Sequence, residues 1–217
     1  MGGMVMRRAV DMLVCVVVGL VLVPVMLVVA GLVRWRLGSP VLFRQTRVGA
    51  RGREFRIVKF RTMRPERWPG EPDADRDSTL GRRLRAVSLD ELPQLWNVLV
   101  GEMSLIGPRP TLPEQVRCYS ERQRHRLDIR PGLTGWAQVN GRNSISWPER
   151  IELDLHYIEN RSVLLDARII ARTAKTLARP VGIYGAGGVN PGFPMPETAT
   201  APSTTAEATT TAGNSST

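Results

Sequence analysis

Two adjacent carboxylates, Asp90 and Glu91, lie in the stretch SLDELPQLWNVLVGEMSLIGPRP, residues 88–110, just before an apolar run with helical spacing. The stretch closes on Arg109, which is held between two prolines. Carboxylates combined with phosphate oxygens form a typical magnesium site, because Mg²⁺ keeps several waters and takes few protein ligands. Once the metal neutralises charge, one carboxylate can attack phosphorus and form a covalent aspartyl-phosphate-type intermediate.

A purely structural explanation of the same two carboxylates is open as well. Ser88, followed three residues later by Glu91, matches a capping box with the serine as N-cap of a helix. Glu91 would then be a cap partner. Asp90 would be a first-turn anion that stabilises the helix by roughly some tenths of a kcal/mol through the helix dipole. Both interpretations begin a helix at Ser88, whose N-terminal amides would keep the two carboxylates ionised and could bind phosphate.

Basic and flexible segments near this pair would suit a phosphate ligand. Arg85 lies just before the pair, and the prolines around Arg109 restrict its backbone, so that its guanidinium fork is positioned at lower entropic cost. A second stretch, RPGLTGWAQVNGRN at residues 130–143, is punctuated by glycines and carries Gln138 and Arg142. Because glycine lets the backbone approach a ligand closely, this loop is a further candidate for a substrate site.

The composition argues against several kinds of chemistry. The formal net charge is +10, and nearly all of the positive charge is arginine, with lysine only at Lys59 and Lys175. The two cysteines and two histidines are scattered without metal-ligand spacing, which argues against a disulfide framework, a zinc site and serine–histidine catalysis. Basic residues alternate with Asp and Glu and no aromatic pattern recurs, so no nucleic-acid partner is expected.

The apolar run Met12–Val33 is long enough to enter a membrane, by the rule that about 20 residues span a bilayer. Arginines flank it on both sides, and such residues favour the cytoplasmic face. Pro24, near its middle, lacks the N–H that continues a helix and therefore breaks or kinks it. We expect residues 1–36 to form a re-entrant membrane helix that is broken at Pro24 and returns to the same face. A tilted single span is the alternative.

The rest of the chain divides by composition into a globular part and a tail. Residues 37–184 are mixed in character and are expected to form a globular domain, which the family resemblance described below implies to be cytoplasmic and catalytic. Residues 185–217 are rich in Ala, Thr, Ser and Pro, so they cannot bury enough apolar surface to offset the entropy of ordering. We therefore predict an α+β, mainly helical fold with a disordered C-terminal tail.

Within the globular part, residues 41–47 and 54–61 are rich in β-formers and enclose two glycines, which predicts a β-hairpin. The alternation slips in the second run, so we expect a bulge there or an early end of the strand. Residues 64–79 are expected to form a solvated loop. Helices are predicted to begin at Ser88 and near Pro113, and to cover residues 148–159 and 163–177.

The last of these helices carries an apolar stripe opposite a basic face. The stripe consists of Val163, Ala167, Ile170, Ala174 and Leu177. Either the stripe packs into the core, or the helix is amphipathic and interfacial and rests on anionic lipid headgroups.

Several of these stretches occur together, in the same order, in one known family. They are RRAVD, the membrane helix with its proline, GSPVLFRQTRVG, FRIVKFRTM, SLDELPQLWNVLVGEMSLIGPRP and RPGLTGWAQVNGRN. From about residue 7 to residue 177 the chain resembles the monotopic bacterial sugar transferases, the polyprenyl-phosphate phosphoglycosyltransferases, in their small minimal form. The resemblance implies Mg²⁺-dependent transfer of a sugar phosphate from a UDP-sugar to a polyprenyl phosphate, such as undecaprenyl phosphate. UMP would be released in the first membrane step of exopolysaccharide, capsule or O-antigen biosynthesis.

The same resemblance assigns roles to residues. Asp90 matches the aspartate that acts as nucleophile and binds the metal, and Glu91 matches the neighbouring glutamate, an acid/base or metal-assisting group. The predicted substrate-binding residues are Lys59, Arg85, Arg109, Gln138, Arg142 and Asp154, of which Arg85 is included for its position before the pair. Where the family often has a serine before the helix-breaking proline, this chain has Val23.

The family also implies a location and partners. The catalytic domain is expected on the cytoplasmic face of the bacterial inner membrane, in contact with its lipids, and a homodimer is compatible with the sequence. Two non-catalytic alternatives stay open: a basic, membrane-anchored module that binds acidic partners, and an inactive family member that acts as a scaffold. The intact Asp90–Glu91 pair argues against the scaffold.

Overall fold

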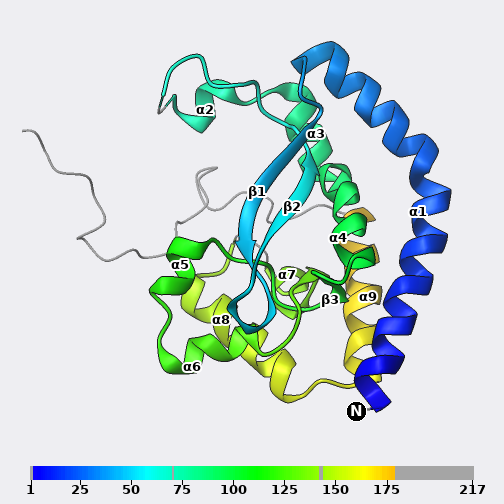
Figure 1. The fold of residues 1–217 in the computed structure, drawn as a ribbon, viewed down its shortest axis with the longest axis vertical. Helices are drawn as coiled ribbons and strands as arrows, with labels where there is room; N and C mark the ends of the chain where they lie inside the picture. The colour runs from blue at the N-terminus through cyan, green and yellow to red at the C-terminus, as the bar shows by residue number, and fades with distance from the viewer. Residues whose placement is uncertain (1, 70, 142–143, 179–217) are drawn as a thin grey trace, which may run out of the picture.

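The computed structural model describes residues 2–69, 71–141 and 144–178, in which helices surround two small sheets (Figure 1). The helices are α1 Gly2–Leu37, α2 Asp73–Arg76, α3 Thr79–Ala86, α4 Leu95–Leu99, α5 Pro113–Arg117, α6 Glu121–Arg124, α7 Trp136–Val139, α8 Trp147–Glu159 and α9 Val163–Ala178. The strands are β1 Leu42–Val48, β2 Glu54–Phe60, β3 Ser104–Ile106 and β4 Gly132–Thr134, and short 3₁₀ helices are η1 Ala50–Gly52, η2 Leu89–Gln94 and η3 His125–Leu127. The α+β, mainly helical fold is confirmed. The predicted tail, residues 185–217, lies outside the described residues.

Helix α1 is a single curved helix along one side of the molecule (Figure 1). The predicted break at Pro24 is absent, because the helix continues through this residue to Leu37. Proline removes one hydrogen bond from the ladder, and the bonds on either side suffice to keep the two halves in one helix. Its segment Val5–Leu37 is long and apolar enough to enter a membrane.

The N-terminal end of α1 is bonded to the elements that surround the carboxylates. The Arg8 guanidinium donates to the carbonyl oxygen of Leu99 at 2.8 Å, at the end of α4. Asp11 accepts a hydrogen bond of 2.6 Å from the Ser104 hydroxyl, at the start of β3. These hydrogen bonds fix the first turns of the apolar helix to α4 and β3.

The C-terminal end of α1 packs against the same body through apolar contacts. Val29 and Val33 are buried in one cluster with Phe60 of β2 and Leu84 of α3. Between these attachments, many apolar side chains of α1 are exposed, among them Leu13, Val17, Leu20, Val21, Leu27 and Val28. Both ends of the helix therefore lie on one body, while an apolar face between them is left uncovered.

The predicted hairpin is confirmed as the antiparallel pair β1–β2, in register from Leu42 opposite Phe60 to Val48 opposite Glu54. The ladder contains no bulge, and β2 ends at Phe60, one residue before the predicted end. The slip in alternation reflects Val58, which is partly buried because α4 also covers its strand: the Val58 amide donates to the Asn97 side chain at 3.1 Å.

A second pair of strands, β3 and β4, is parallel and has no counterpart in the predictions. Each strand has three residues, too few for a period-two pattern to be visible in the sequence. Their close approach depends on glycine: a Cβ at Gly132 would lie 2.1 Å from the Gly107 nitrogen. The strand pair places the segment that follows β3, including Arg109, beside η3.

Helix α9 packs by a different face from the predicted stripe. Ile169 is fully buried, whereas Val163 and Ile170 are 80% and 56% exposed. Because the buried face was not the stripe, the core-packed alternative is wrong for these residues. The exposed apolar stripe is compatible with the interfacial alternative.

The predicted solvated loop at residues 64–79 contains more order than expected. Helix α2 lies within it, and the carboxylate of Glu71 is enclosed by Arg64 and Arg67. The sequence did not predict this arrangement, because an ion-pair cluster produces no periodic pattern.

Candidate active site

The carboxylate pair lies on η2, a 3₁₀ helix, and not on the first turn of an α-helix. Ser88 adopts a left-handed conformation with φ of 57°, and its side chain makes no capping hydrogen bond. The Glu91 side chain is engaged elsewhere, so the predicted capping box is wrong. Pro93 within this turn is consistent with the tighter, irregular geometry.

Glu91 is held by two cations from separate elements. The Lys59 ammonium on β2 donates to Glu91 Oε1 at 2.8 Å. The Arg109 guanidinium, on the segment after β3, donates to the same oxygen at 2.6 Å. The fold therefore unites three of the predicted site residues around one carboxylate, although they are separated by up to 50 positions (from Lys59 to Arg109).

The two neighbouring carboxyls have opposite pKa shifts. Burial, followed by the negative charge of Glu91, raises the pKa of Asp90 above its ordinary value. Burial acts in the same direction on Glu91, but the Arg109 and Lys59 cations outweigh it and hold the pKa of Glu91 well below the usual range. The expectation that helix amides keep both carboxyls ionised is thus corrected: cations stabilise the ionised form of Glu91, and Asp90 is destabilised as an anion.

Asp90 is the less compensated member of the pair. Its residue is only 6% exposed, and in the described ranges no hydrogen bond holds its carboxylate. A buried carboxylate without a partner is costly, and a cation or an electrophile can relieve that cost. Both Glu91 oxygens, in contrast, face Arg109, at 2.6 and 3.5 Å.

The remaining predicted substrate residues have different positions. Arg85 on α3 donates to the Thr62 hydroxyl at 2.8 Å and pairs with Asp77. Its positive charge partly offsets the rise in the pKa of Asp90. Gln138 on α7 has a buried side-chain amide that lacks a hydrogen-bond partner among the described residues. Arg142 lies outside the described residues.

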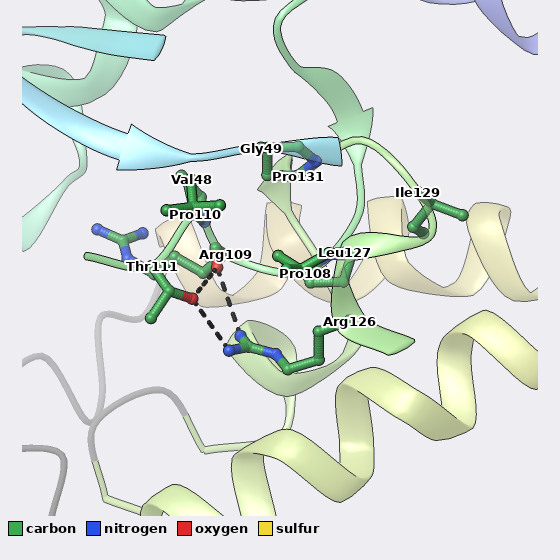
Figure 2. Close-up of a pocket in the computed structure, with 10 residues that line it drawn as sticks. All are labelled: Val48, Gly49, Pro108, Arg109, Pro110, Thr111, Arg126, Leu127, Ile129 and Pro131. Carbon is green, nitrogen blue, oxygen red and sulfur yellow. Dashed lines mark hydrogen bonds between the residues drawn. The ribbon is translucent and has the colours of Figure 1, made fainter. Parts of the chain in front are cut away.

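Asp154 on α8 lies one layer behind Arg109. It forms a buried ion pair with Arg126, whose Nη2 is 2.6 Å from Asp154 Oδ2. Figure 2 shows that Arg126 also reaches the Thr111 hydroxyl and the main-chain oxygen of Arg109. The Asp154 carboxylate is directed at Arg126 and not at the carboxylate pair. Asp154 is therefore linked to Arg109 only indirectly, through Arg126 and the main chain of the Arg109 segment.

A small cavity lies on the Arg126 side of this segment (Figure 2), and its lining includes Val48, Pro108 and Pro131. The Arg109 side chain extends away from Arg126 in Figure 2. Its guanidinium donates to Glu91. Asp90 and Glu91 do not line the cavity. Arg109 is thus the residue that the cavity lining shares with the carboxylate cluster.

Two contributors to this region were missed from the sequence. Burial, together with the nearby Arg109 charge, lowers the pKa of Arg47 to about 10, and its guanidinium contacts the Pro110 oxygen at 3.5 Å. Arg47 is not among the predicted site residues, because its sequence neighbourhood indicates only a strand. Arg126 carried no local signal, since its partners are distant in sequence.

Comparison with known proteins gives consistent results. The model of the family described as "Bacterial sugar transferase" matches residues 3–180. The chain is 46% identical over 162 residues to an uncharacterized sugar transferase, EpsL, of Bacillus subtilis, covering 73% of this chain and 80% of the relative.

Two further relatives are named for specific reactions. A UDP-glucose:undecaprenyl-phosphate glucose-1-phosphate transferase of Caulobacter vibrioides is 40% identical over 191 residues, which cover 82% of this chain and 72% of that protein. A UDP-N-acetylgalactosamine-undecaprenyl-phosphate N-acetylgalactosaminephosphotransferase of Aeromonas hydrophila is 38% identical over 187 residues, covering 81% and 44%. Relatives of nearly equal identity thus act on different sugars.

Proposed function

Because this chain belongs to the bacterial sugar transferase family, we propose that it transfers a sugar 1-phosphate from a UDP-sugar to a membrane polyprenyl phosphate such as undecaprenyl phosphate. The products would be polyprenyl-diphosphate-sugar and UMP. The observation that carries the proposal is the contrast within the pair: Glu91 is clamped by Lys59 and Arg109, while Asp90 is buried without such a partner.

In the first step, an Asp90 oxygen attacks the phosphorus that bears the sugar. A bond forms between that oxygen and the phosphorus, and the bond from the phosphorus to the bridging oxygen of the diphosphate breaks. UMP leaves with the bonding electron pair, and a phosphosugar remains linked to Asp90. A carboxylate with a raised pKa is a stronger nucleophile once ionised.

In the second step, an oxygen of polyprenyl phosphate attacks the same phosphorus. The bond between phosphorus and the Asp90 oxygen breaks, which regenerates the carboxylate and yields the diphosphate-linked product. Arg109 and Lys59 lie where they can stabilise charge on phosphate oxygens, while Glu91 keeps both cations in place. Arg109 is half exposed, so its fork is accessible to a ligand.

Mg²⁺ fits this donor set at Asp90. Among the described residues no cluster of three or more His, Cys, Asp or Glu side chains could hold a metal, so a bound ion would need phosphate oxygens and waters as further ligands. When bound there, Mg²⁺ would neutralise charge on the diphosphate and favour the ionised form of Asp90. Glu91 could join as a ligand only by giving up part of its pairing with Arg109 and Lys59.

The test is UMP release by the purified full-length protein from a panel of UDP-sugars, with Mg²⁺ and polyprenyl phosphate. We expect UMP from one or a few of these sugars and none without the divalent cation. Absence of UMP with every sugar would favour a non-catalytic, membrane-anchored binding or scaffold protein.

We further propose that the protein is monotopic, with its catalytic domain on the cytoplasmic face of the inner membrane. Both ends of α1 attach to one body, as the contacts of Arg8 and of Val33 show, and the apolar surface between them is exposed. Attachment of both ends of α1 to one domain supports a monotopic arrangement, because both flanks of the apolar run are then expected on the same side of the membrane.

Cysteine labelling tests this topology. Single cysteines at Gly2 and at Arg36, in a chain whose Cys15 and Cys118 are replaced by serine, should both be protected from a membrane-impermeant reagent added from the periplasmic side. Labelling of one position and not the other would establish a spanning helix and contradict the proposal.

A further inference from the structure

The segment that carries Arg109 has little hydrogen-bonding capacity of its own. Pro108 and Pro110 flank the arginine, and proline has no N–H to donate. On its N-terminal side the segment is fixed by the Gly132 amide, which donates to the Pro108 oxygen at 2.8 Å. On the other side the Val48 amide donates to the Thr111 oxygen at 2.9 Å. Between these two hydrogen bonds, the position of the segment depends on side chains from other elements.

Arg126 supplies that support from behind the segment (Figure 2). Its Nη1 donates to the Thr111 hydroxyl at 3.0 Å and also bonds the Tyr119 hydroxyl. Its Nη2 contacts the main-chain oxygen of Arg109 at 3.4 Å. The Tyr119 hydroxyl in turn donates to Thr111 at 2.9 Å, so that three side chains close a small network.

The Arg126 fork is itself fixed by Asp154. Its Nε and Nη2 both reach Asp154 Oδ2, at 3.0 and 2.6 Å. The two side chains are only 2% and 1% exposed. A buried ion pair is weak evidence for stability, since well-packed apolar residues of similar volume often do as well. A rigid guanidinium, held through two donors on one Asp154 oxygen, has a clearer use in fixing the geometry of the groups that it contacts.

We infer that Arg126, held by Asp154 and Tyr119, is a positioning residue for Arg109. Arg126 contacts the main chain and the Thr111 hydroxyl, whereas the Arg109 side chain leaves on the opposite side toward Glu91. A shift of the segment would therefore move the Arg109 guanidinium relative to Glu91 without any direct contact from Arg126 to a substrate. Asp154 acts in this network as the anchor of Arg126. The catalytic consequence rests on the proposed function.

Arg126→Ala is a poor test, because it would leave the Asp154 charge buried and unpaired and could prevent folding. Thr111→Val and Tyr119→Phe are milder, since each removes one hydroxyl and nearly keeps the shape of the side chain. The first readout is independent of activity: the rate at which phenylglyoxal modifies Arg109, followed by peptide mass spectrometry. The exposed Arg44 on β1 is the internal reference.

We expect labelling of Arg109 to rise about fivefold in each variant, the equilibrium factor of one ordinary hydrogen bond, with Arg44 unchanged. Unchanged labelling of Arg109 in both variants would overturn the inference, as would a rise shared by Arg44, which indicates general loosening. This readout decides the inference even if the wild-type protein releases no UMP, a result that would contradict only the proposed function.

If UMP is released, a double-mutant cycle adds a second decision. Tyr119→Phe should lower kcat by a similar factor in the wild-type background and have no further effect when Arg109 is already alanine. Equal factors in both backgrounds would mean that Tyr119 acts independently of Arg109, which contradicts the inference. Arg122→Gln, which breaks an exposed pair with Glu152, is the matched control and should leave kcat unchanged.

Discussion

Two glutamates in this protein are clamped by pairs of cations, one in the segment around α2 and the other at the candidate active site. Glu71 accepts from Arg64 at 2.9 Å and from Arg67 at 3.0 Å. Glu91 accepts from Arg109 and Lys59 at 2.6 and 2.8 Å. In both cases the cations lower the pKa of the carboxyl, for Glu71 to about 2 with the Arg64 hydrogen bond as the main cause.

The difference lies in the neighbour of each glutamate. Glu71 is followed by Pro72, which has no group for chemistry, whereas Glu91 is preceded by Asp90, a buried carboxyl whose pKa is raised. A clamped glutamate is therefore a structural device that the fold uses twice. Reactivity is expected where the clamp leaves an adjacent anion uncompensated.

The largest effect should come from removing that anion. Asp90→Asn keeps the shape of the side chain but cannot attack phosphorus or bind Mg²⁺ as a carboxylate does, so UMP release should fall by about a thousandfold or more. The thermal midpoint should be equal to or above that of the wild type, since a buried charge is removed. Turnover near the wild-type rate would reduce Asp90 to the same structural class as Glu71.

Arg109→Lys should have the next largest effect. Lysine keeps the charge but loses the fork that contacts Glu91, so kcat/KM should fall more than tenfold, a loss of over about 1.4 kcal/mol of transition-state stabilisation. Arg44→Lys on the exposed side of β1 is the matched control and should change little. Near-normal turnover in Arg109→Lys would make the proline-flanked arginine a structural turn.

The pH dependence distinguishes the two carboxyls. Asp90 must be ionised to react, and its pKa is raised in the free protein. On acidification, kcat/KM should therefore begin to fall at a higher pH than for an ordinary aspartate, whose pKa is about 3.9. In Glu91→Gln the acid limb of the residual activity should move to lower pH. The pKa of Asp90 falls in this variant, because a nearby negative charge disappears while Lys59 and Arg109 remain. A limb that stays fixed in this variant would show that another group titrates.

Glu71→Gln should have the smallest effect on turnover, within about twofold of the wild type, because Glu71 lies outside the carboxylate cluster. Its effect should be on stability. The folded-state pKa of Glu71 is below its unfolded value of about 4.3, so its contribution is present above that pH and is lost as the pH falls toward 2. Urea unfolding should separate variant and wild type at pH 7, show a smaller separation at pH 3, and bring the two together only near pH 2. A pH-independent difference would contradict this origin.

The sequence predicted those features that depend on local pattern or composition. The apolar run, the hairpin and the helices at α8 and α9 follow from periodicity, and the resemblance to a family identified Lys59, Asp90, Glu91 and Arg109, which the fold brings together. The stretch around Ser88 was misread because a capping box is a local pattern, whereas the Glu91 side chain is directed by cations from distant elements.

Long-range contacts account for most of what the sequence did not predict. Arg126 meets its partners Thr111 and Asp154 across 15 and 28 positions, and no periodicity links them. The β3–β4 pair depends on the close approach of Gly107 and Gly132, which only the folded chain reveals. The sequence left two alternatives open for the apolar stripe of α9, because an apolar stripe does not indicate whether protein or lipid covers it.

The most direct test of the account is a search for the covalent species. The wild-type protein is mixed with its UDP-sugar and Mg²⁺ in the absence of polyprenyl phosphate, and both UMP and the intact mass are measured. The account predicts about one UMP per active site and a gain equal to one phosphosugar, located at Asp90 by peptide mapping and absent from Asp90→Asn. UMP formed only after polyprenyl phosphate is added, with no mass gain beforehand, would contradict the role of Asp90 as nucleophile.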